Sequence, residues 1–430
     1  MENKKVVEQE NKEYSYFYSL ELEGINCFKD KQTIDLSEEN GNYSPWTIIL
    51  GDNGTGKTTL LRVLDRMQPI YSSMEQKYLP YLFLYSSILK SDFLYVNLSL
   101  DNKEIKKFMY KKLTDNRSEG GDKNGESNNN FPFLISYGAS RRMSKNPNIY
   151  QKENNLNKNT SLFDESIELI NVEEWYLQKF LALSSAENGV KVKLEQQLAL
   201  IEKVVVDFLP DVLDLRIKEI KTVNDKSALE VKINENEWIN LRNLSFGYQT
   251  LTALIVDIAS KMMEQYPNSA NPLEEPVIVL IDEIDLHLHP KWQRTVINKL
   301  SEHFPKAQFI ATSHSPLIVQ AALDKKANIV VCRKEGDKVV IDNSPDEVKG
   351  WRIDQILTSD LFELSSSKSV SFEEMRNEKT RILLKDKLTD SDNKVIEFLN
   401  KKLNIGPVFS SKEGIDAEEL IKKAAELLKK

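Results

Sequence analysis

The sequence predicts an α/β fold that combines mixed sheets, a helical insertion and a helical C-terminal tail. Three apolar runs, at residues 45–50, 276–282 and 307–314, are short enough to be buried strands. The first run leads through glycines into residues 57–67, whose apolar positions have helical spacing. A strand, a glycine-rich loop and a helix in this order are typical of parallel α/β folds.

The composition is that of a soluble globular protein. The chain has 430 residues, of which 29% are charged, and a mean hydropathy of −0.45. Its formal charge of −8 disfavours a surface that coats nucleic acid indiscriminately. No apolar run approaches the ~20 residues of a membrane helix, and the N-terminus lacks the apolar core of a signal peptide. Two cysteines, Cys27 and Cys332, form no disulfide framework, so we expect a reduced, cytoplasmic location and no membrane partner.

Changes in composition and periodicity divide the chain into four expected regions. They are 14–150 for the N-terminal part of a head domain, 151–240 for an insertion lobe of helices and strands, 241–345 for the C-terminal part of the head, and 346–430 for a helical tail. Within the first region, residues 14–37 predict a β-pair and residues 93–113 predict a hairpin. Residues 114–130 are rich in Gly, Asn and Ser, which predicts a mobile loop.

Residues 51–58 match the phosphate-binding pattern G-x-x-x-x-G-K-[ST] in full. Glycines let the backbone wrap tightly, so that N–H groups and a helix N-terminus can face the phosphates. Lys57 is expected to neutralise phosphate charge, and Thr58 is expected to offer its hydroxyl to Mg²⁺. The other expected nucleotide contacts in this loop are Asn53, Gly54, Gly56 and Thr59.

Asp282 and Glu283 stand at the end of the second apolar run. Asp282 is expected to hold Mg²⁺ directly or through water, and Glu283 to polarise an attacking water as general base. Adjacent acids can also form a solvated turn or a helix cap, but the intact phosphate loop favours the catalytic interpretation. Residues 290–304, which follow, predict a single helix.

His314 ends the third apolar run, where it can sense a γ-phosphate by hydrogen bonding. A packed structural histidine is the alternative. A serine–histidine nucleophile is disfavoured because no glycine elbow surrounds Ser313 or Ser315. His287 and His289 lie just after the acids, but four histidines in the chain and no nearby cysteine disfavour a zinc site.

Residues 244–249, "LSFGYQ", precede the acids and begin a predicted helix. The candidate nucleotide-binding residues of this segment are Ser245, Gly247 and Gln249. A hydroxyl, a glycine and free N–H groups at a helix start can bind an anion. Taken alone, the same residues also fit an ordinary helix cap.

The order of these motifs resembles that of the ABC-type ATPases: a phosphate loop, a long insertion, L-S-x-G-x-Q, a strand ending in Asp-Glu and a strand ending in Ser-His. Ile25-Asn26-Cys27-Phe28, "HLHP" and "TSHSP" are similar to elements of the soluble SMC/RecF/OLD-like branch. Together, "GDNGTGKTTLLR", "YGASR", "LSFGYQ", "HLHPKWQ" and "GWRIDQILTSDLF" look most like the ATPase subunits of Septu-type anti-phage defence systems. The resemblance covers residues 14–364.

This resemblance implies an ABC-type P-loop ATPase head that uses ATP and Mg²⁺. It implies a sandwich dimer, able to assemble further, in which ATP lies between the phosphate loop of one subunit and Ser245–Gln249 of the other. It also implies a separate HNH-type nuclease that the ATPase scaffolds and restrains. The tail lies outside the ATPase core, and it either packs on its own subunit or contacts a second dimer or the effector. Hydrolysis can be slow in such a switch. We expect no nuclease in this chain, because residues after 346 hold no strand-ended acidic cluster.

Two alternatives stay open. A RecF/SMC-like DNA repair ATPase would bind DNA along a basic groove with a steep salt dependence. A defence ATPase paired with a Toprim nuclease or a retron has the same core motifs. A transporter subunit fits the "HLHP" element and the helical tail poorly.

The sequence departs from the family pattern at two places. Phe246 replaces the glycine common at the third signature position, and "FLISYGASRR" lacks the usual Q-loop glutamine, the nearest being Gln151. The role of that glutamine toward Mg²⁺ and water is therefore unassigned. Tyr137, Arg141 and Arg142 in the same segment form either a solvated strand end or a coupling loop near the nucleotide.

Overall fold

The computed structural model describes most of the chain outside its N-terminus, parts of residues 67–159 and its C-terminal end. The described residues are 16–38, 40–66, 69–72, 77–80, 93–100, 104–111, 132–144, 160–209, 212, 214–217, 229–234, 237–343, 353–359, 362, 369–383, 385 and 389–403. The predicted mobile loop at 114–130, Gln151 and residues 404–430 lie outside them. The chain divides into two compact units, residues 1–356 and 357–430, which are described separately.

A six-stranded mixed sheet forms the centre of the first unit, in the order β15-β14-β3-β13-β12-β8. The strands are β3 (Trp46–Gly51), β8 (Leu134–Tyr137), β12 (Val277–Ile281), β13 (Ala307–Thr312), β14 (Asn328–Glu335) and β15 (Lys338–Asp342). All neighbours are parallel except β14 and β15. Every residue of β8, β12 and β13 is buried, which explains their unbroken apolar runs: a parallel sheet is covered on both faces. The predicted α/β fold with mixed sheets is confirmed.

A second sheet is antiparallel and has the order β2-β1-β6-β7. Its strands are β1 (Phe17–Glu23), β2 (Gln32–Asp35), β6 (Phe93–Leu100) and β7 (Glu104–Lys111). The predicted β-pair and hairpin are thereby confirmed. Helix α1 (Lys57–Arg66) shares one apolar core with β1, β2 and the central strands. Leu60 and Leu61 of this helix are fully buried there, which contributes about 1.5–3 kcal/mol each and fixes the end of the phosphate loop.

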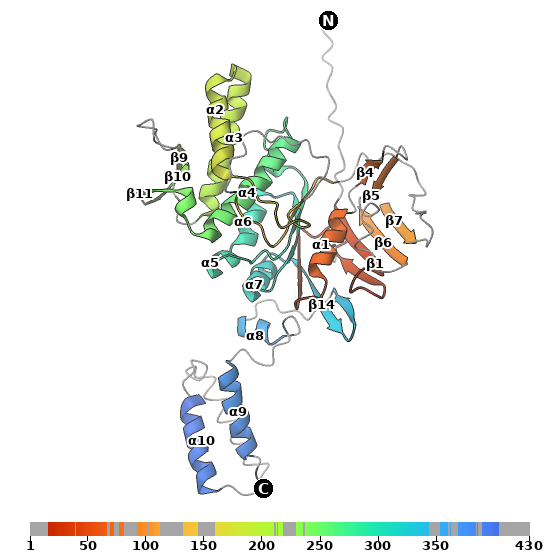
Figure 1. Ribbon diagram of the computed structural model, residues 1–430, viewed down its shortest axis with the longest axis vertical. Coiled ribbons are helices and arrows are strands. Elements are labelled where there is room, and N and C mark those ends of the chain that lie inside the picture. The colour runs from red at the N-terminus through yellow and green to blue at the C-terminus, as the bar shows by residue number, and fades with distance from the viewer. Residues whose placement is uncertain are drawn as a thin grey trace. The chain divides into compact units, whose positions relative to one another are not determined.

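The residues expected to form an insertion lobe, 151–240, contain two adjacent helices and a small sheet where the structure describes them. Helices α2 (Val172–Ser185) and α3 (Asn188–Phe208) run side by side, and the sheet has the order β11-β10-β9 (Figure 1). Its strands are β9 (Asp214–Ile217), β10 (Leu229–Asn234) and β11 (Glu237–Asn240). A 3₁₀ turn, η3 (Leu241–Asn243), then connects the lobe to the long buried helix α4 (Phe246–Gln265).

The remaining elements of the first unit are β4 (Pro69–Ser72), β5 (Lys77–Pro80), η4 (Pro272–Glu274), α5 (Pro290–Gln293), α6 (Val296–His303), α7 (Pro316–Asp324) and the start of α8 (Ile353–Leu357). The single helix predicted over 290–304 is wrong, because α5 and α6 are separate. The N–H of Thr295 donates to the carbonyl of Trp292 at 2.9 Å, a 3₁₀-type bond that breaks the helical ladder there.

The second unit contains α9 (Val370–Leu383) and α10 (Asp390–Leu403). They pack through Ile382, Leu399 and Leu403. The predicted helical tail is confirmed for these residues. Among the described residues of both units, no helix is long and apolar enough to cross a membrane.

Candidate functional site

The loop between β3 and α1 adopts a conformation that requires glycine. Gly51, Gly54 and Gly56 have φ of 140°, 80° and 84°. A Cβ at Gly51 would lie 2.3 Å from the carbonyl oxygen of Cys332, and one at Gly56 would lie 2.5 Å from Cys27 Sγ. At Gly54 nothing lies within 4 Å, so that part of the loop is open. Tight packing on one side and open space at the tip suit a loop that wraps an anion.

Lys57 is the first residue of α1, and its ammonium group is held by the loop. Its Nζ donates to the carbonyls of Gly51 at 2.8 Å and Asp52 at 2.9 Å. Burial lowers the pKa of Lys57, and neighbouring acids including Asp282 oppose that effect. The amino group of Lys57 is therefore largely shielded from solvent within the loop. Of the other predicted loop residues, Asn53 and Gly54 are exposed, while Gly56 and Thr59 are half-buried.

The two predicted metal-holding residues meet, although they are far apart in sequence. Thr58 Oγ1 donates to Oδ2 of Asp282 at 2.8 Å. Asp282 is 5% exposed, and its other oxygen accepts from Thr312 Oγ1 at 2.6 Å. A hydroxyl and a carboxylate are the hard oxygen donors that Mg²⁺ prefers, so these residues fit that ion.

Glu283 has a left-handed backbone, with φ of 50°. Its N–H donates to Thr312 Oγ1 at 2.7 Å, so one hydroxyl connects the backbone of Glu283 with the carboxylate of Asp282. Sequence reasoning missed Thr312. The available signal was its place at the end of β13, because carboxyl ends of neighbouring parallel strands lie at the same sheet edge.

The sequence left Arg141 either at a solvated strand end or in a coupling loop near the nucleotide, and in the structure its guanidinium reaches the backbone of the same two acids. Its Nη1 donates to the carbonyls of Gly138 at 3.0 Å and of Asp282, and its Nη2 donates to the carbonyl of Glu283 at 2.7 Å. Tyr137, also buried, donates its hydroxyl to Asp257 of α4 at 2.7 Å. Burial, together with Asp257, raises the pKa of Tyr137 well above its usual value. The interpretation of this segment as a solvated strand end is wrong for Tyr137 and Arg141.

His314 follows β13 and is exposed. Its backbone N–H donates to Oδ1 of Asp285 at 3.3 Å, and the buried Ser313 donates its hydroxyl to the same oxygen at 2.6 Å. Asp285, which sequence reasoning did not select, thus connects the turn after the acids to the end of β13. The other histidine of interest, His289, caps α5 through its Nδ1 and the N–H of Lys291.

The signature residues lie at the start of α4. Ser245 is the exposed N-cap, and its hydroxyl makes no capping hydrogen bond. Gly247 packs closely, because a Cβ there would lie 2.5 Å from the carbonyl oxygen of His287. Phe246, 49% exposed, meets the His287 ring edge-on at 4.7 Å between centroids. The signature and the turn after the acids are therefore packed together in one subunit.

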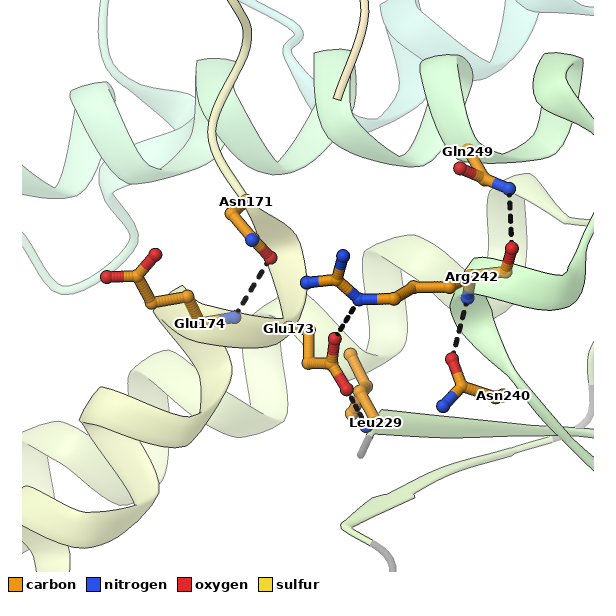
Figure 2. Close-up of polar contacts among 7 residues, drawn as sticks. All are labelled: Asn171, Glu173, Glu174, Leu229, Asn240, Arg242 and Gln249. Atoms are coloured by element: carbon orange, nitrogen blue, oxygen red, sulfur yellow. Dashed lines mark hydrogen bonds and ion pairs between the residues drawn. The ribbon is translucent and has the colours of Figure 1, made fainter. Parts of the chain in front are cut away.

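Gln249 turns back toward the insertion lobe, as Figure 2 shows. Its Nε2 donates to the carbonyls of Arg242 at 2.9 Å and Leu244 at 2.8 Å. The guanidinium of Arg242 pairs with the buried carboxylate of Glu173 in α2, which also accepts the N–H of Leu229 at 3.0 Å (Figure 2). The signature is thus connected through Arg242 to the first helix of the lobe.

Comparisons with known protein families match two parts of this chain. A family described as "AAA domain, putative AbiEii toxin, Type IV TA system" matches residues 112–320. A family described as "AAA domain" matches residues 19–65. The two ranges include the phosphate loop, the signature, the paired acids and His314.

Several individual proteins are also similar to this chain. The chain is 28% identical over 341 residues to the Septu protein PtuA of Bacillus mycoides (strain KBAB4), which covers 77% of this chain and 42% of that protein. It is 26% identical over 338 residues to the Septu protein PtuA of Bacillus thuringiensis, covering 75% of this chain and 79% of that protein. The Retron Vc95 probable ATPase of Vibrio cholerae serotype O1 biovar El Tor is 39% identical over 137 residues, 32% of this chain and 26% of that protein.

The chain therefore spans less than half the length of the Bacillus mycoides PtuA protein and of the Vibrio cholerae retron ATPase. Among solved structures, an SMC head bound to the C-winged helix domain of ScpA covers 76% of this chain and 97% of that chain, at 16% identity and a TM-score of 0.43. The expected resemblance to Septu-type ATPases is confirmed by the PtuA relatives.

Proposed function

We propose that this chain is an ATP-binding and ATP-hydrolysing subunit of an anti-phage defence complex. The observation that supports it most directly is the hydrogen bond between Thr58, next to the phosphate-loop lysine, and Asp282 at the end of β12. It joins a phosphate-binding element to an acidic strand end in one site. The similarity to PtuA proteins supports the assignment to defence.

In this proposal the loop binds the phosphates through its N–H groups, and Lys57 neutralises their charge. Thr58 and Asp282 would hold Mg²⁺, which would supply positive charge to offset that of the phosphates. Glu283 is the general base that takes a proton from the attacking water, and His314 hydrogen-bonds the γ-phosphate. The remaining nucleotide contacts of the loop are proposed to come from Asn53, Gly54, Gly56 and Thr59.

The second half of each site comes from another subunit. Ser245, Gly247 and Gln249 are proposed to meet the γ-phosphate bound by the partner, since a helix start with a free hydroxyl suits an anion. Ser245 is exposed and its hydroxyl makes no capping bond, which leaves it free for this contact. Gln249 would have to leave the carbonyls of Arg242 and Leu244, so dimer closure would also alter the connection to α2.

The effector is proposed to be a separate HNH-type nuclease that the ATPase scaffolds and restrains. The test combines the purified full chain with a co-expressed HNH protein and measures complex formation and DNA cleavage with and without ATP. A stable complex whose cleavage depends on nucleotide supports the proposal. ATP binding and hydrolysis without any complex would retain the ATPase assignment and refute this partner.

The similarity to a retron ATPase favours one alternative, a defence ATPase with a different effector. Co-expression with a retron reverse transcriptase and its RNA would then yield the complex that the HNH protein does not. A RecF/SMC-like repair ATPase would instead bind DNA directly, with an affinity that falls steeply with salt.

A further inference from the structure

Arg141 is a buried cation to which the roles above assign nothing. It follows β8 in the sequence and is 3% exposed. The guanidinium donates to three backbone carbonyls, those of Gly138, Asp282 and Glu283. A guanidinium is planar and rigid, so acceptors that share it are held in a fixed arrangement. Arg141 therefore determines where the backbone of the two acids lies.

The charge of Arg141 is stabilised by the same acids. An unpaired buried guanidinium would be costly, and the carboxylates of Asp282, Asp285 and Glu283 offset that cost. Burial lowers the pKa of Arg141 to about 10, against the opposing effect of these three carboxylates. The side chain is therefore still protonated at neutral pH. It supplies a permanent positive charge next to a cluster of three acids.

The backbone of Glu283 needs this support. Its φ of 50° lies in the left-handed region, which costs a residue with a Cβ about 1–2 kcal/mol. The N–H of Glu283 is held by Thr312 and its carbonyl by Arg141, so both peptide groups of the residue are fixed. The direction of the Cα–Cβ bond follows from those peptide planes. The direction in which the Glu283 side chain leaves the backbone is thus set by Thr312 and Arg141, which lie on other parts of the chain.

We propose that Arg141 is a positioning residue for ATP hydrolysis, which holds the left-handed turn at Glu283 and so aims its carboxylate at the attacking water. This inference rests on the proposed function, because it takes Glu283 as the general base. Arg141 acts through the backbone of the acids. Its loss therefore affects turnover far more than nucleotide affinity.

The neighbouring residue provides a matched control. Arg142 is exposed and pairs with Glu168 at 2.9 Å on the surface. Arg141→Lys keeps the positive charge but removes the planar fork. With the full-length chain and Mg²⁺, single-turnover hydrolysis of radiolabelled ATP should slow at least about tenfold in Arg141→Lys, since small misplacements of a catalytic group cost up to about 100-fold. Affinity for a fluorescent ATP analogue should stay within about threefold, and Arg142→Ala should change neither quantity.

A double substitution separates positioning from general damage. In the Glu283→Gln background, adding Arg141→Lys should slow hydrolysis by less than about twofold, because the group that Arg141 positions is already lost. An equal slowing in both backgrounds would overturn the inference, as would Arg141→Lys with the parent rate. If Arg141→Lys does not fold by circular dichroism, Arg141→Gln replaces it, and failure of both to fold would show a purely structural role. A parent chain that never hydrolyses ATP would instead refute the proposed function.

Discussion

Thr58 Oγ1 lies 2.8 Å from Oδ2 of Asp282, across a separation of 224 positions in the sequence. The order of strands explains this contact, because β13 lies between β3 and β12 in the central sheet and all three are parallel. Their carboxyl ends therefore lie at one edge, where ligand sites of open α/β sheets form. At the same edge, the hydroxyl of Thr312, the last residue of β13, donates to the other carboxylate oxygen of Asp282 at 2.6 Å.

Lys57→Ala should weaken ATP binding at least about tenfold, because it removes the cation of the phosphate loop. The measurement is an equilibrium titration with a fluorescent ATP analogue in the presence of Mg²⁺. Lys325→Ala, which alters an exposed lysine after α7, is the control and should bind as the parent does. Equal affinity of Lys57→Ala and the parent would contradict the role of the loop.

Glu283→Gln should retain ATP binding and slow hydrolysis about 100-fold or more, since an amide cannot accept the proton of the attacking water. It should also accumulate the ATP-bound dimer, measured by light scattering on a sizing column. Glu302→Gln, an exposed residue of α6, should leave both unchanged. Parent-like hydrolysis by Glu283→Gln would show that another group is the base.

Thr312→Val should lower the free energy of unfolding by about 1–3 kcal/mol, because the partly buried N–H of Glu283 would lose its acceptor and the buried Asp282 would lose a donor. Thr312→Ser keeps the hydroxyl and should cost clearly less. Urea unfolding of both variants measures the difference. Equal destabilisation would mean that the hydroxyl, lost in Thr312→Val, stabilises this position no more than the methyl group lost in Thr312→Ser, and would contradict the prediction.

Gly51→Ala should destabilise the chain more than Gly336→Ala. Both glycines have positive φ, but a Cβ at Gly51 would lie 2.3 Å from a backbone oxygen of β14, whereas nothing lies within 4 Å at Gly336. Gly336→Ala should therefore cost only the left-handed penalty of about 1–2 kcal/mol. Thermal unfolding compares the two, and similar melting temperatures would contradict the close approach of β3 and β14.

Glu173→Ala should cost about 1–3 kcal/mol, because it leaves the buried N–H of Leu229 without its acceptor. Glu173→Gln keeps an acceptor for this N–H and should lower the free energy of unfolding by less. The lost ion pair with Arg242 contributes little, because the Arg242 side chain is 37% exposed and solvent weakens the pair. Glu168→Ala removes the surface pair with Arg142 and should cost at most about 1 kcal/mol. Urea unfolding ranks the three, and an equal cost for all would contradict a buried link between α2 and the signature.

Short local sequence patterns were sufficient to select many of the residues of the candidate site. The glycine spacing at 51–58, the apolar run before Asp282 and the run before His314 are each contained in a few consecutive residues. The helix over 290–304 was mispredicted because its apolar spacing continues through Thr295, while the 3₁₀ bond that divides it depends on backbone geometry. Gln249 looked like a free signature residue, yet it donates to two carbonyls of the preceding turn.

The sequence by itself determined the α/β class, the strand–loop–helix around Lys57 and the acids after β12, because these depend on side-chain periodicity and on residues next to one another. Only the tertiary structure decided that Thr312 and Arg141 hold the two acids. Their partners lie 29 to 142 positions away, on elements that become neighbours through the order of strands in the sheet. A hydroxyl or a guanidinium can donate to any nearby oxygen, so its residue type alone does not specify its partner.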